Sequence, residues 1–139
     1  MTRNTHTADE TIDLGINLGK KLKAGSIVAL KGILGAGKTT LVKGIARGLN
    51  ITEEITSPSF TIISEYRGSL PLYHMDLLRI SGIEEFDLLG VDEMLYGSGV
   101  SVIEWSEKVE KILPPNRISV EISLQGDGSR LIGIEGVEI

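Results

Sequence analysis

The sequence predicts an α/β fold in which a mixed sheet lies between layers of helices and carries antiparallel hairpins. The apolar run at residues 27–30 is typical of a strand buried on both faces. Residues 8–23 and 38–49 repeat apolar side chains at helical spacing. Two later pairs of apolar runs are joined by short turns that contain glycine, which indicates hairpins. With 139 residues, we expect one three-layer domain, 1–139, with a core of its own.

The composition is that of a globular protein and excludes several kinds of site. Hydrophobic residues make up 41% and charged residues 24% of the chain, close to globular averages. The chain has no cysteine, which excludes disulfides, thiolate zinc sites and iron–sulfur clusters. When glycine is not counted, the longest apolar run has only four residues, and the N-terminus lacks an apolar signal core. We therefore expect a cytoplasmic protein without a membrane span.

Charge is distributed unevenly along the chain. Residues 1–49 contain 8 Lys and Arg against 3 Asp and Glu, whereas residues 50–139 contain 6 against 16. The basic first third favours contact with phosphate, while the acidic remainder disfavours a broad nucleic-acid surface.

The first half of the chain predicts helix, strand, glycine-rich turn and helix in immediate succession. Thr7 to Glu10 match a capping box, which places a helix over about 8–23. The strand at 27–30 leads into the turn at 32–37, and a second helix follows over about 38–49.

The second half predicts two hairpins separated by short helices. Pro71 favours the start or edge of its strand, and Pro114-Pro115 ends the last helix. The expected strands are 60–66, 70–76, 100–104, 118–124 and 130–134, and the expected helices are 83–95 and 105–113.

Residues Gly32 to Thr39 match the phosphate-loop pattern G-x-x-x-x-G-K-[ST] in full. Glycines let the backbone curl so that its N–H groups point at phosphate oxygens, and the following helix directs its dipole at the same anion. Lys38 can reach the β- and γ-phosphates, and Thr39 can offer its hydroxyl to Mg²⁺. The preceding buried strand and the following helix supply the context that the motif requires, so we predict a P-loop NTPase-like fold that binds a nucleotide.

Two acids at strand ends are candidates for metal binding and catalysis. Glu104 ends the strand 100–104 and Asp76 ends the strand 70–76, and a phosphate loop needs such a carboxylate beside its metal. The residues alone leave open which acid orients water and which binds metal. His74 is expected to pack or hydrogen-bond structurally.

Other polar residues carry weaker indications. The hydroxyls of Ser57-Pro58-Ser59 are candidates for a nucleotide-sensing loop. Arg67 and Arg79 are candidates for charge stabilisation, although a solvated surface is the simpler interpretation. Arg130 follows the last turn, where its guanidinium can stack on a base.

Taken together, four segments resemble the TsaE family of small bacterial ATPases that are required for making threonylcarbamoyladenosine on tRNA. They are Gly32–Thr40, Ser57-Pro58-Ser59-Phe60-Thr61, His74-Met75-Asp76-Leu77-Leu78-Arg79 and Ile103-Glu104-Trp105. The resemblance implies Mg²⁺-dependent ATP hydrolysis that supports a partner complex of TsaD with TsaB, with tRNA involved indirectly. It also implies that Thr39 and Glu104 hold Mg²⁺, that Trp105 lies beside the site and that Thr7 and Ala8 lie near adenine.

The motifs and the resemblance together give a set of predicted site residues. The predicted catalytic residues are Lys38, Asp76 and Glu104, and the predicted metal ligands are Thr39, Asp76 and Glu104. The predicted nucleotide-binding residues are Thr7, Ala8, Gly35, Ala36, Gly37, Lys38, Thr39, Thr40 and Arg130.

Three positions depart from the family pattern. Ile33 stands where the family usually has an acid, Ser59 replaces a threonine and Leu78 replaces a common tyrosine. None of these changes removes a phosphate or metal group.

Other functions share the same loop. A small-molecule kinase is the alternative, although 139 residues leave little room for an acceptor pocket and an arginine-bearing lid. A GTPase is disfavoured for two reasons. Asp87 to Gly90 match the D-x-x-G motif, but no strand is expected before them, and the chain has no N-K-x-D motif for recognising guanine. A scaffold that holds nucleotide without hydrolysis is the non-enzymatic alternative.

Overall fold

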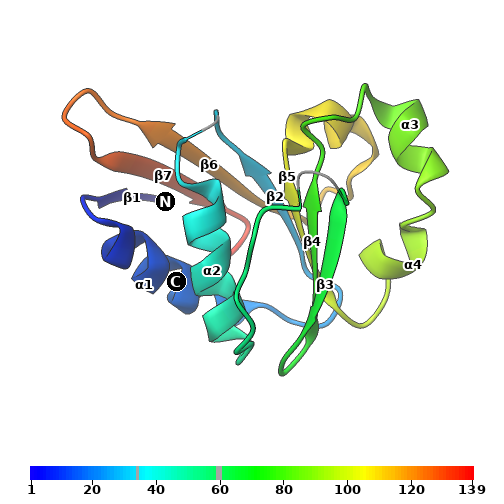
Figure 1. Ribbon diagram of the computed structural model, residues 1–139, viewed down its shortest axis with the longest axis horizontal. Coiled ribbons are helices and arrows are strands. Elements are labelled where there is room, and N and C mark those ends of the chain that lie inside the picture. Colours follow the sequence, from blue (N-terminus) through cyan, green and yellow to red (C-terminus); the bar gives the residue numbers. More distant parts are fainter. Residues whose placement is uncertain (34, 59–60) are drawn as a thin grey trace.

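The described residues of the computed structural model, 1–33, 35–58 and 61–139, form one seven-stranded mixed sheet (Figure 1). The strands are β1 (Thr2–Thr5), β2 (Ile27–Lys31), β3 (Ile63–Arg67), β4 (Pro71–Asp76), β5 (Val100–Glu104), β6 (Ile118–Leu124) and β7 (Arg130–Glu135). The helices are α1 (Ala8–Lys21), α2 (Lys38–Gly48), α3 (Ile83–Leu88), α4 (Asp92–Leu95) and the 3₁₀ helix η1 (Ser106–Ile112).

The strand order places the phosphate-loop strand in the middle of the sheet. The order is β1-β7-β6-β2-β5-β4-β3. Strands β6, β2, β5 and β4 run parallel, while the pairs β3–β4 and β6–β7 are antiparallel hairpins. The expected combination of parallel strands and hairpins is therefore confirmed. Because the carboxyl ends of β2, β5 and β4 meet at one edge, residues that follow these strands are brought together.

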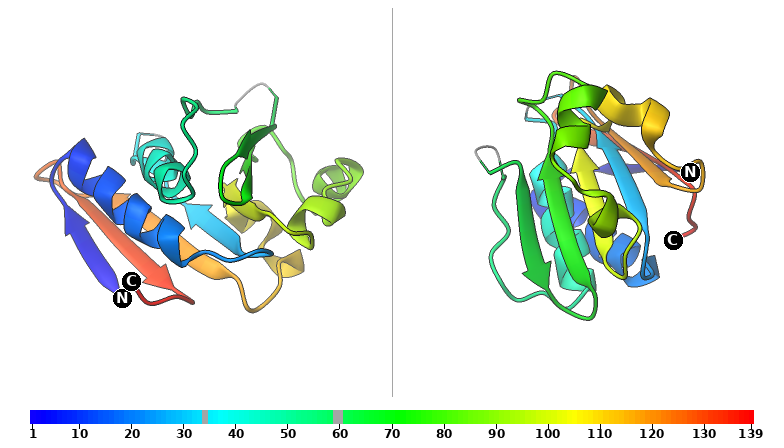
Figure 2. Two further views of the ribbon diagram at one scale, coloured as in Figure 1. Left: turned by 90° about the horizontal axis from the view of Figure 1, so that it is seen from below. Right: turned by 90° about the vertical axis from the view of Figure 1, so that its right-hand side faces the viewer.

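Helices cover both faces of the sheet. Alternate side chains of β2 point to opposite faces, since a strand has a two-residue period. Val28 and Leu30 pack in the core beneath α1 and α2, whereas Ile27 and Ala29 pack with α3, α4 and η1. Figure 2 shows the two groups of helices in its two views. None of the described helices is long and apolar enough to cross a membrane.

The start of α1 is fixed by the predicted capping box. Thr7 Oγ1 accepts a hydrogen bond from Glu10 N at 3.1 Å, and the Glu10 carboxylate accepts one from His6 N at 2.7 Å. The Thr5 and Thr11 hydroxyls hydrogen-bond at 2.7 Å, which ties β1 to α1. These bonds hold the segment around Thr7 beside the start of α2.

Helices α1 and α2 approach each other through glycines, and they lie side by side in Figures 1 and 2. Gly15 and Gly19 of α1 face Gly44 and Gly48 of α2. A Cβ atom on Gly44 would lie 2.2 Å from Ile12 O, so no larger side chain fits there without moving a helix. The close approach links the helix that follows the phosphate loop to the first helix of the chain.

Some boundaries differ from the sequence prediction. Strand β1 was not predicted, because its residues are polar and mostly exposed and it pairs with β7 through backbone hydrogen bonds. The single helix expected at 83–95 is two short helices, since Gly90 adopts a φ of 66° between them. Strand β3 begins at Ile63, and residue 60, the first of the expected strand 60–66, lies outside the described residues.

Candidate functional site

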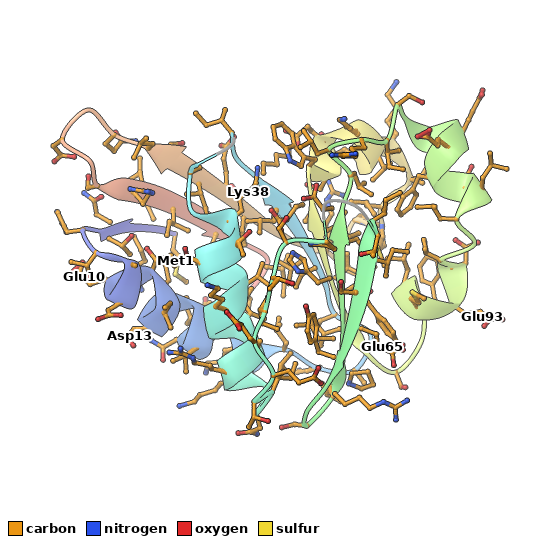
Figure 3. All side chains as sticks on the ribbon, viewed as in Figure 1. Met1, Glu10, Asp13, Lys38, Glu65 and Glu93 are labelled. Carbon is orange, nitrogen blue, oxygen red and sulfur yellow. The ribbon has the colours of Figure 1, made fainter. Side chains whose placement is uncertain are left out.

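The loop between β2 and α2 has the curled backbone that phosphate binding needs. Gly35 and Gly37 adopt φ angles of 79° and 105°, which side chains with a Cβ atom disfavour. Leu41 N then donates to Gly37 O at 3.0 Å as α2 begins. Figure 3 shows Lys38 at the start of that helix, beside the end of β2. Leu34 of the motif lies outside the described residues.

A cavity of about 310 Å³ opens at the carboxyl ends of β2, β4 and β5. Its walls bring together the phosphate loop, the first turn of α2, the two strand-end acids and the start of β7. The lining residues are Ile33, Gly35, Gly37, Lys38, Thr39, Thr40, Ser57, Asp76, Glu104, Trp105 and Arg130.

Lys38 is buried and turned toward its own loop. Its ammonium group donates to the carbonyl oxygen of Gly32, lies 3.5 Å from Ile33 O and is 3.9 Å from the centre of the Trp105 ring. Burial lowers the pKa of Lys38, and the negative charges of Glu104, Asp76 and Glu107 partly oppose this effect. The nearest strong charges are therefore acidic, and an incoming phosphate would add more negative charge to this environment.

Asp76 and Glu104 occupy equivalent positions on neighbouring parallel strands. They are register partners at the ends of β4 and β5, and both are buried. Asp76 Oδ1 accepts from Leu78 N at 2.9 Å, and its Oδ2 accepts from Ser57 Oγ at 3.2 Å. Both oxygens of this carboxylate are therefore already oriented by the protein.

Glu104 is held by a different partner. Its Oε2 atom hydrogen-bonds with Nε2 of His74, a residue that is completely buried on β4. The chain then bends sharply, because Trp105 adopts a left-handed φ of 59°. This bend turns the Trp105 ring toward Lys38.

Arg130 connects the last hairpin to the phosphate loop. Its Nε atom donates to Ala36 O at 2.7 Å, and its Nη2 atom lies 3.4 Å from Gly35 O. A third donor, Nη1, binds Gly128 O at 2.8 Å. The guanidinium therefore ties the phosphate loop to the last hairpin; the stacking on a base stays a prediction.

A smaller hollow of about 90 Å³ adjoins the cavity and shares Gly37, Thr40 and Arg130 with it. The start of α1 forms its other wall. The remaining lining residues are His6, Thr7, Ala8 and Thr11. The structure thus places Thr7 and Ala8 next to the phosphate loop; their contact with adenine stays a prediction.

The predicted site residues lie around these two adjoining hollows, with Ala36 buried in the loop and held by Arg130. Arg67 and Arg79 are absent from the described walls of both. Ser57 reaches the site through Asp76, whereas Ser59 and Phe60 lie outside the described residues.

Two residues that line the smaller hollow, His6 and Thr11, were not predicted from the sequence. The contact between His74 and Glu104 was not predicted either. For His74 a signal existed, because it lies two residues before Asp76 and thus on the same face of its strand.

Comparison with known proteins assigns this arrangement to a family. The family model described as "Threonylcarbamoyl adenosine biosynthesis protein TsaE" matches residues 5–132. The chain belongs to the TsaE family. The match includes the phosphate loop, both strand-end acids and Arg130.

Relatives in several bacteria share this TsaE-family sequence over most of its length. The tRNA threonylcarbamoyladenosine biosynthesis protein TsaE of Treponema pallidum is 45% identical over 130 residues, which is 94% of this chain and 96% of the relative. The Bacillus subtilis protein of the same name is 47% identical over 116 residues, covering 83% of this chain and 72% of the relative. A crystal structure of Bacillus subtilis YdiB matches with a TM-score of 0.83 and 41% identity, covering 95% of this chain and 82% of that one. The α/β fold is therefore that of a solved relative.

The oxygen donors at this TsaE-family site suit Mg²⁺. Among the described residues, no group of three or more His, Asp or Glu side chains is placed to hold a metal ion. Mg²⁺ does not need such a cage, since it is usually bound by one or two carboxylates together with waters and substrate phosphates. The Thr39 hydroxyl and the carboxylates of Asp76 and Glu104, which line one cavity, fit that pattern.

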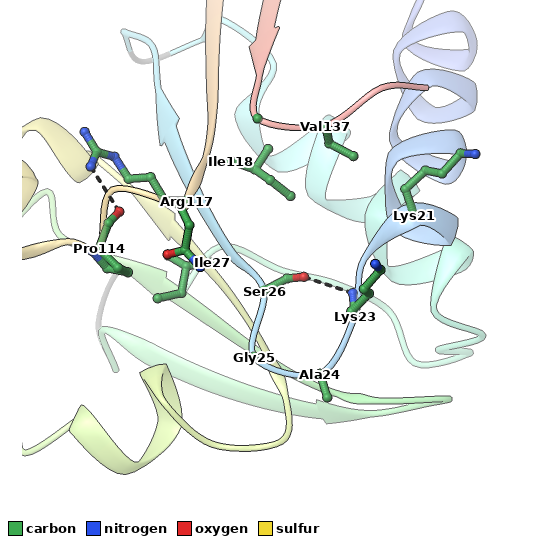
Figure 4. A pocket seen from close by; sticks show the side chains of 12 residues that line it. Lys21, Lys23, Ala24, Gly25, Ser26, Ile27, Pro114, Arg117, Ile118 and Val137 are labelled. Carbon is green, nitrogen blue, oxygen red and sulfur yellow. Dashed lines mark hydrogen bonds between the residues drawn. The ribbon is translucent and has the colours of Figure 1, made fainter.

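A separate hollow, of about 400 Å³, lies at the opposite end of β2 (Figure 4). Lys21 and Lys23 line it, and Arg117 turns its guanidinium toward Pro114 O at 3.2 Å. No Asp or Glu lines its described walls. Although this hollow is larger, it lacks a glycine loop with a helix N-terminus and carboxylates for a metal, so the phosphate-loop cavity is the better candidate site.

Proposed function

We propose that this chain is a Mg²⁺-dependent ATPase that supports the formation of threonylcarbamoyladenosine on tRNA, acting with a TsaD–TsaB complex. The observation that carries the proposal is one cavity that combines a curled phosphate loop, Lys38 and two strand-end carboxylates. Membership of the TsaE family supports the role in threonylcarbamoyladenosine biosynthesis.

Each part of the cavity has a chemical role in this proposal. The N–H groups of Gly35, Ala36 and Gly37 and the start of α2 attract the phosphates. Lys38 leaves the carbonyl oxygen of Gly32 and donates to the β- and γ-phosphates instead. Thr40 also binds the phosphates, and Thr7 and Ala8 lie near the adenine end of the nucleotide.

The two carboxylates have different freedom, which suggests different roles. Both oxygens of Asp76 already accept protein hydrogen bonds, so Asp76 suits contact through a metal-bound water. One oxygen of Glu104 is held by His74, and its other oxygen remains for the cavity. Thr39 and Glu104 would therefore hold Mg²⁺ directly, and Mg²⁺ when bound would neutralise charge on the β- and γ-phosphates.

The experiment is a phosphate-release assay with purified chain, ATP and Mg²⁺, with and without TsaD–TsaB. Lys38→Ala should reduce turnover at least about 100-fold, since loss of one preorganised donor to a developing charge costs about 10²–10³ in rate. Lys43→Ala, on the same helix and outside both hollows, should turn over ATP like the wild type.

Three results would contradict the proposal. Turnover by Lys38→Ala at the wild-type rate would reject the site. Absence of turnover by the wild-type chain with and without TsaD–TsaB would favour the nucleotide-holding scaffold. Transfer of phosphate to a small-molecule acceptor would instead support a kinase.

A further inference from the structure

His74 is a buried titratable residue that the proposed reaction does not use. It lies in the middle of β4 and has no exposed surface. Its Nε2 atom contacts Glu104 Oε2, while its Nδ1 atom has no hydrogen-bond partner among the described residues. Ser64, its register partner on β3, makes no hydrogen bond to that nitrogen. If this core position served only for packing, an apolar side chain would give a more stable fold. A buried polar atom without a hydrogen-bond partner lowers the stability of the folded state.

Hydrogen-bond accounting indicates where the proton lies in this pair. If Nδ1 carried a hydrogen, a buried donor would be left without an acceptor, which is the rarer and more costly defect. With the hydrogen on Nε2, the imidazole donates to the Glu104 carboxylate and only an acceptor remains unmatched at Nδ1. The Nε2–H tautomer of His74, donating to Glu104, is therefore the arrangement that best satisfies the buried atoms.

The strand geometry makes this contact specific. Glu104 is the register partner of Asp76, and His74 lies two residues before Asp76 on the same face of β4. His74 thus reaches diagonally across to the last residue of β5. The contact occupies Oε2 of Glu104, so its other oxygen, Oε1, is the one left for the cavity that Lys38 and Asp76 also line.

We propose that His74 is a positioning residue: it donates from Nε2 to Glu104 and so fixes the carboxylate with one defined oxygen presented to the nucleotide site. The inference rests on the proposed function for its catalytic consequence, but the geometry that it predicts can be measured without ATP. Partners of this kind orient a metal-binding side chain from behind, and their loss typically costs 10–100-fold in metal affinity or activity.

The first test reads the proton directly in the nucleotide-free protein. Nitrogen-15 NMR of the imidazoles should show His74 as the Nε2–H tautomer, with its signals assigned by their absence in His74→Gln. The chain has only two histidines, so His6 supplies the other set of signals. Glu104→Leu should change the His74 Nε2 signal. An Nδ1–H tautomer, or an unchanged signal in Glu104→Leu, would overturn the proposal whether or not the chain hydrolyses ATP.

The second test separates positioning from packing. His74→Leu fills a similar volume without a donor, and its kcat for ATP should fall about 10–100-fold while KM for ATP changes little. His74→Gln restores an N–H at nearly the same distance from the backbone and should recover most of the rate. Leu72→Ala, two residues earlier on the same face of β4, should lower the melting temperature without lowering kcat of the folded enzyme.

Each outcome of the second test is decisive. Wild-type kcat in His74→Leu, or equal losses in His74→Leu and His74→Gln, would reduce His74 to a packing residue. Turnover that is absent already in the wild type would reject the proposed function instead, and the tautomer measurement would then decide the positioning role alone.

Discussion

Arg130 shows how a single side chain at the end of the chain can shape a loop near its beginning. The residue lies 94 and 95 positions after Ala36 and Gly35, whose carbonyl oxygens it contacts. Arg130 also lines the cavity, so its guanidinium ties the last hairpin to the phosphate loop at the edge of the site. Hydrogen bonds from a charged donor contribute about 1.5–3 kcal/mol each when both partners are well placed. Arg130 therefore preorganises the phosphate loop before any nucleotide arrives.

Replacing Arg130 with methionine should weaken nucleotide binding. Arg130→Met keeps an unbranched apolar stem but removes the donors to Ala36 O and Gly35 O. We expect the dissociation constant for Mg–ATP to rise about 10-fold, because about 1.4 kcal/mol of preorganisation would be lost. Isothermal titration calorimetry measures this change. Arg67→Met is the matched control, since the Arg67 side chain is 88% exposed; equal affinities for Arg130→Met and the wild type would show that the loop holds its shape unaided.

At the scale of elements, the contact between α1 and α2 positions the two ends of the candidate site relative to each other. Helix α2 starts at the phosphate loop, and α1 starts beside the smaller hollow. The glycines that face each other let the two backbones approach to contact. Neither helix can shift outward without losing this packing. The glycines of the contact, which lie further along both helices, therefore set the distance between Thr7 and the phosphate loop.

A methyl group at the centre of this contact should destabilise the fold. Gly44→Ala would place a Cβ atom 2.2 Å from Ile12 O and 2.8 Å from Gly15 Cα. Alanine's better helix propensity offsets about 1 kcal/mol, but backbone clashes of this kind cost more than that. We expect a net loss of about 2 kcal/mol in the free energy of unfolding, measured by urea denaturation. Gly126→Ala, in a turn where a Cβ would meet nothing within 4 Å, should be nearly neutral; a comparable stability of Gly44→Ala would mean that the helices can separate at little cost.

Elements with strong local signals could be predicted from the sequence, whereas long-range pairings could not. The capping box, the buried strand β2 and the phosphate loop are encoded within a few residues of one another, and their predicted positions are confirmed. The meeting of Asp76 with Glu104 followed from the general geometry of parallel strand ends. The His74–Glu104 contact depends on the same β4–β5 pairing, and the two-residue spacing of His74 from Asp76 was its signal in the sequence. Strand β1 is polar, and its pairing with β7 depends on residues more than 120 positions away.

For the whole molecule, the candidate site is built from nearly the full length of the fold. Its walls begin at His6 before α1 and end at Arg130 on β7, with β4 and β5 between them. All of these elements meet at one edge of the sheet because β2 is central and parallel to both of its neighbours. A nucleotide bound there would contact segments that separate from each other on unfolding. Binding should therefore be coupled to the stability of the entire fold.

This coupling predicts a rise in melting temperature with Mg–ATP. A ligand that binds only the folded state contributes about 2.7 kcal/mol at 100 times its dissociation constant, which for a chain of this size corresponds to a rise of about 10 °C. Differential scanning fluorimetry with ATP, with and without Mg²⁺, measures it. The melting temperature of Lys38→Ala should not rise with Mg–ATP, whereas that of Lys43→Ala should rise as in the wild type, since Lys38 lines the cavity and Lys43 does not. An equal rise in wild type and Lys38→Ala would place the nucleotide elsewhere on the protein, for which the basic hollow at the opposite end of β2 would be the first place to look.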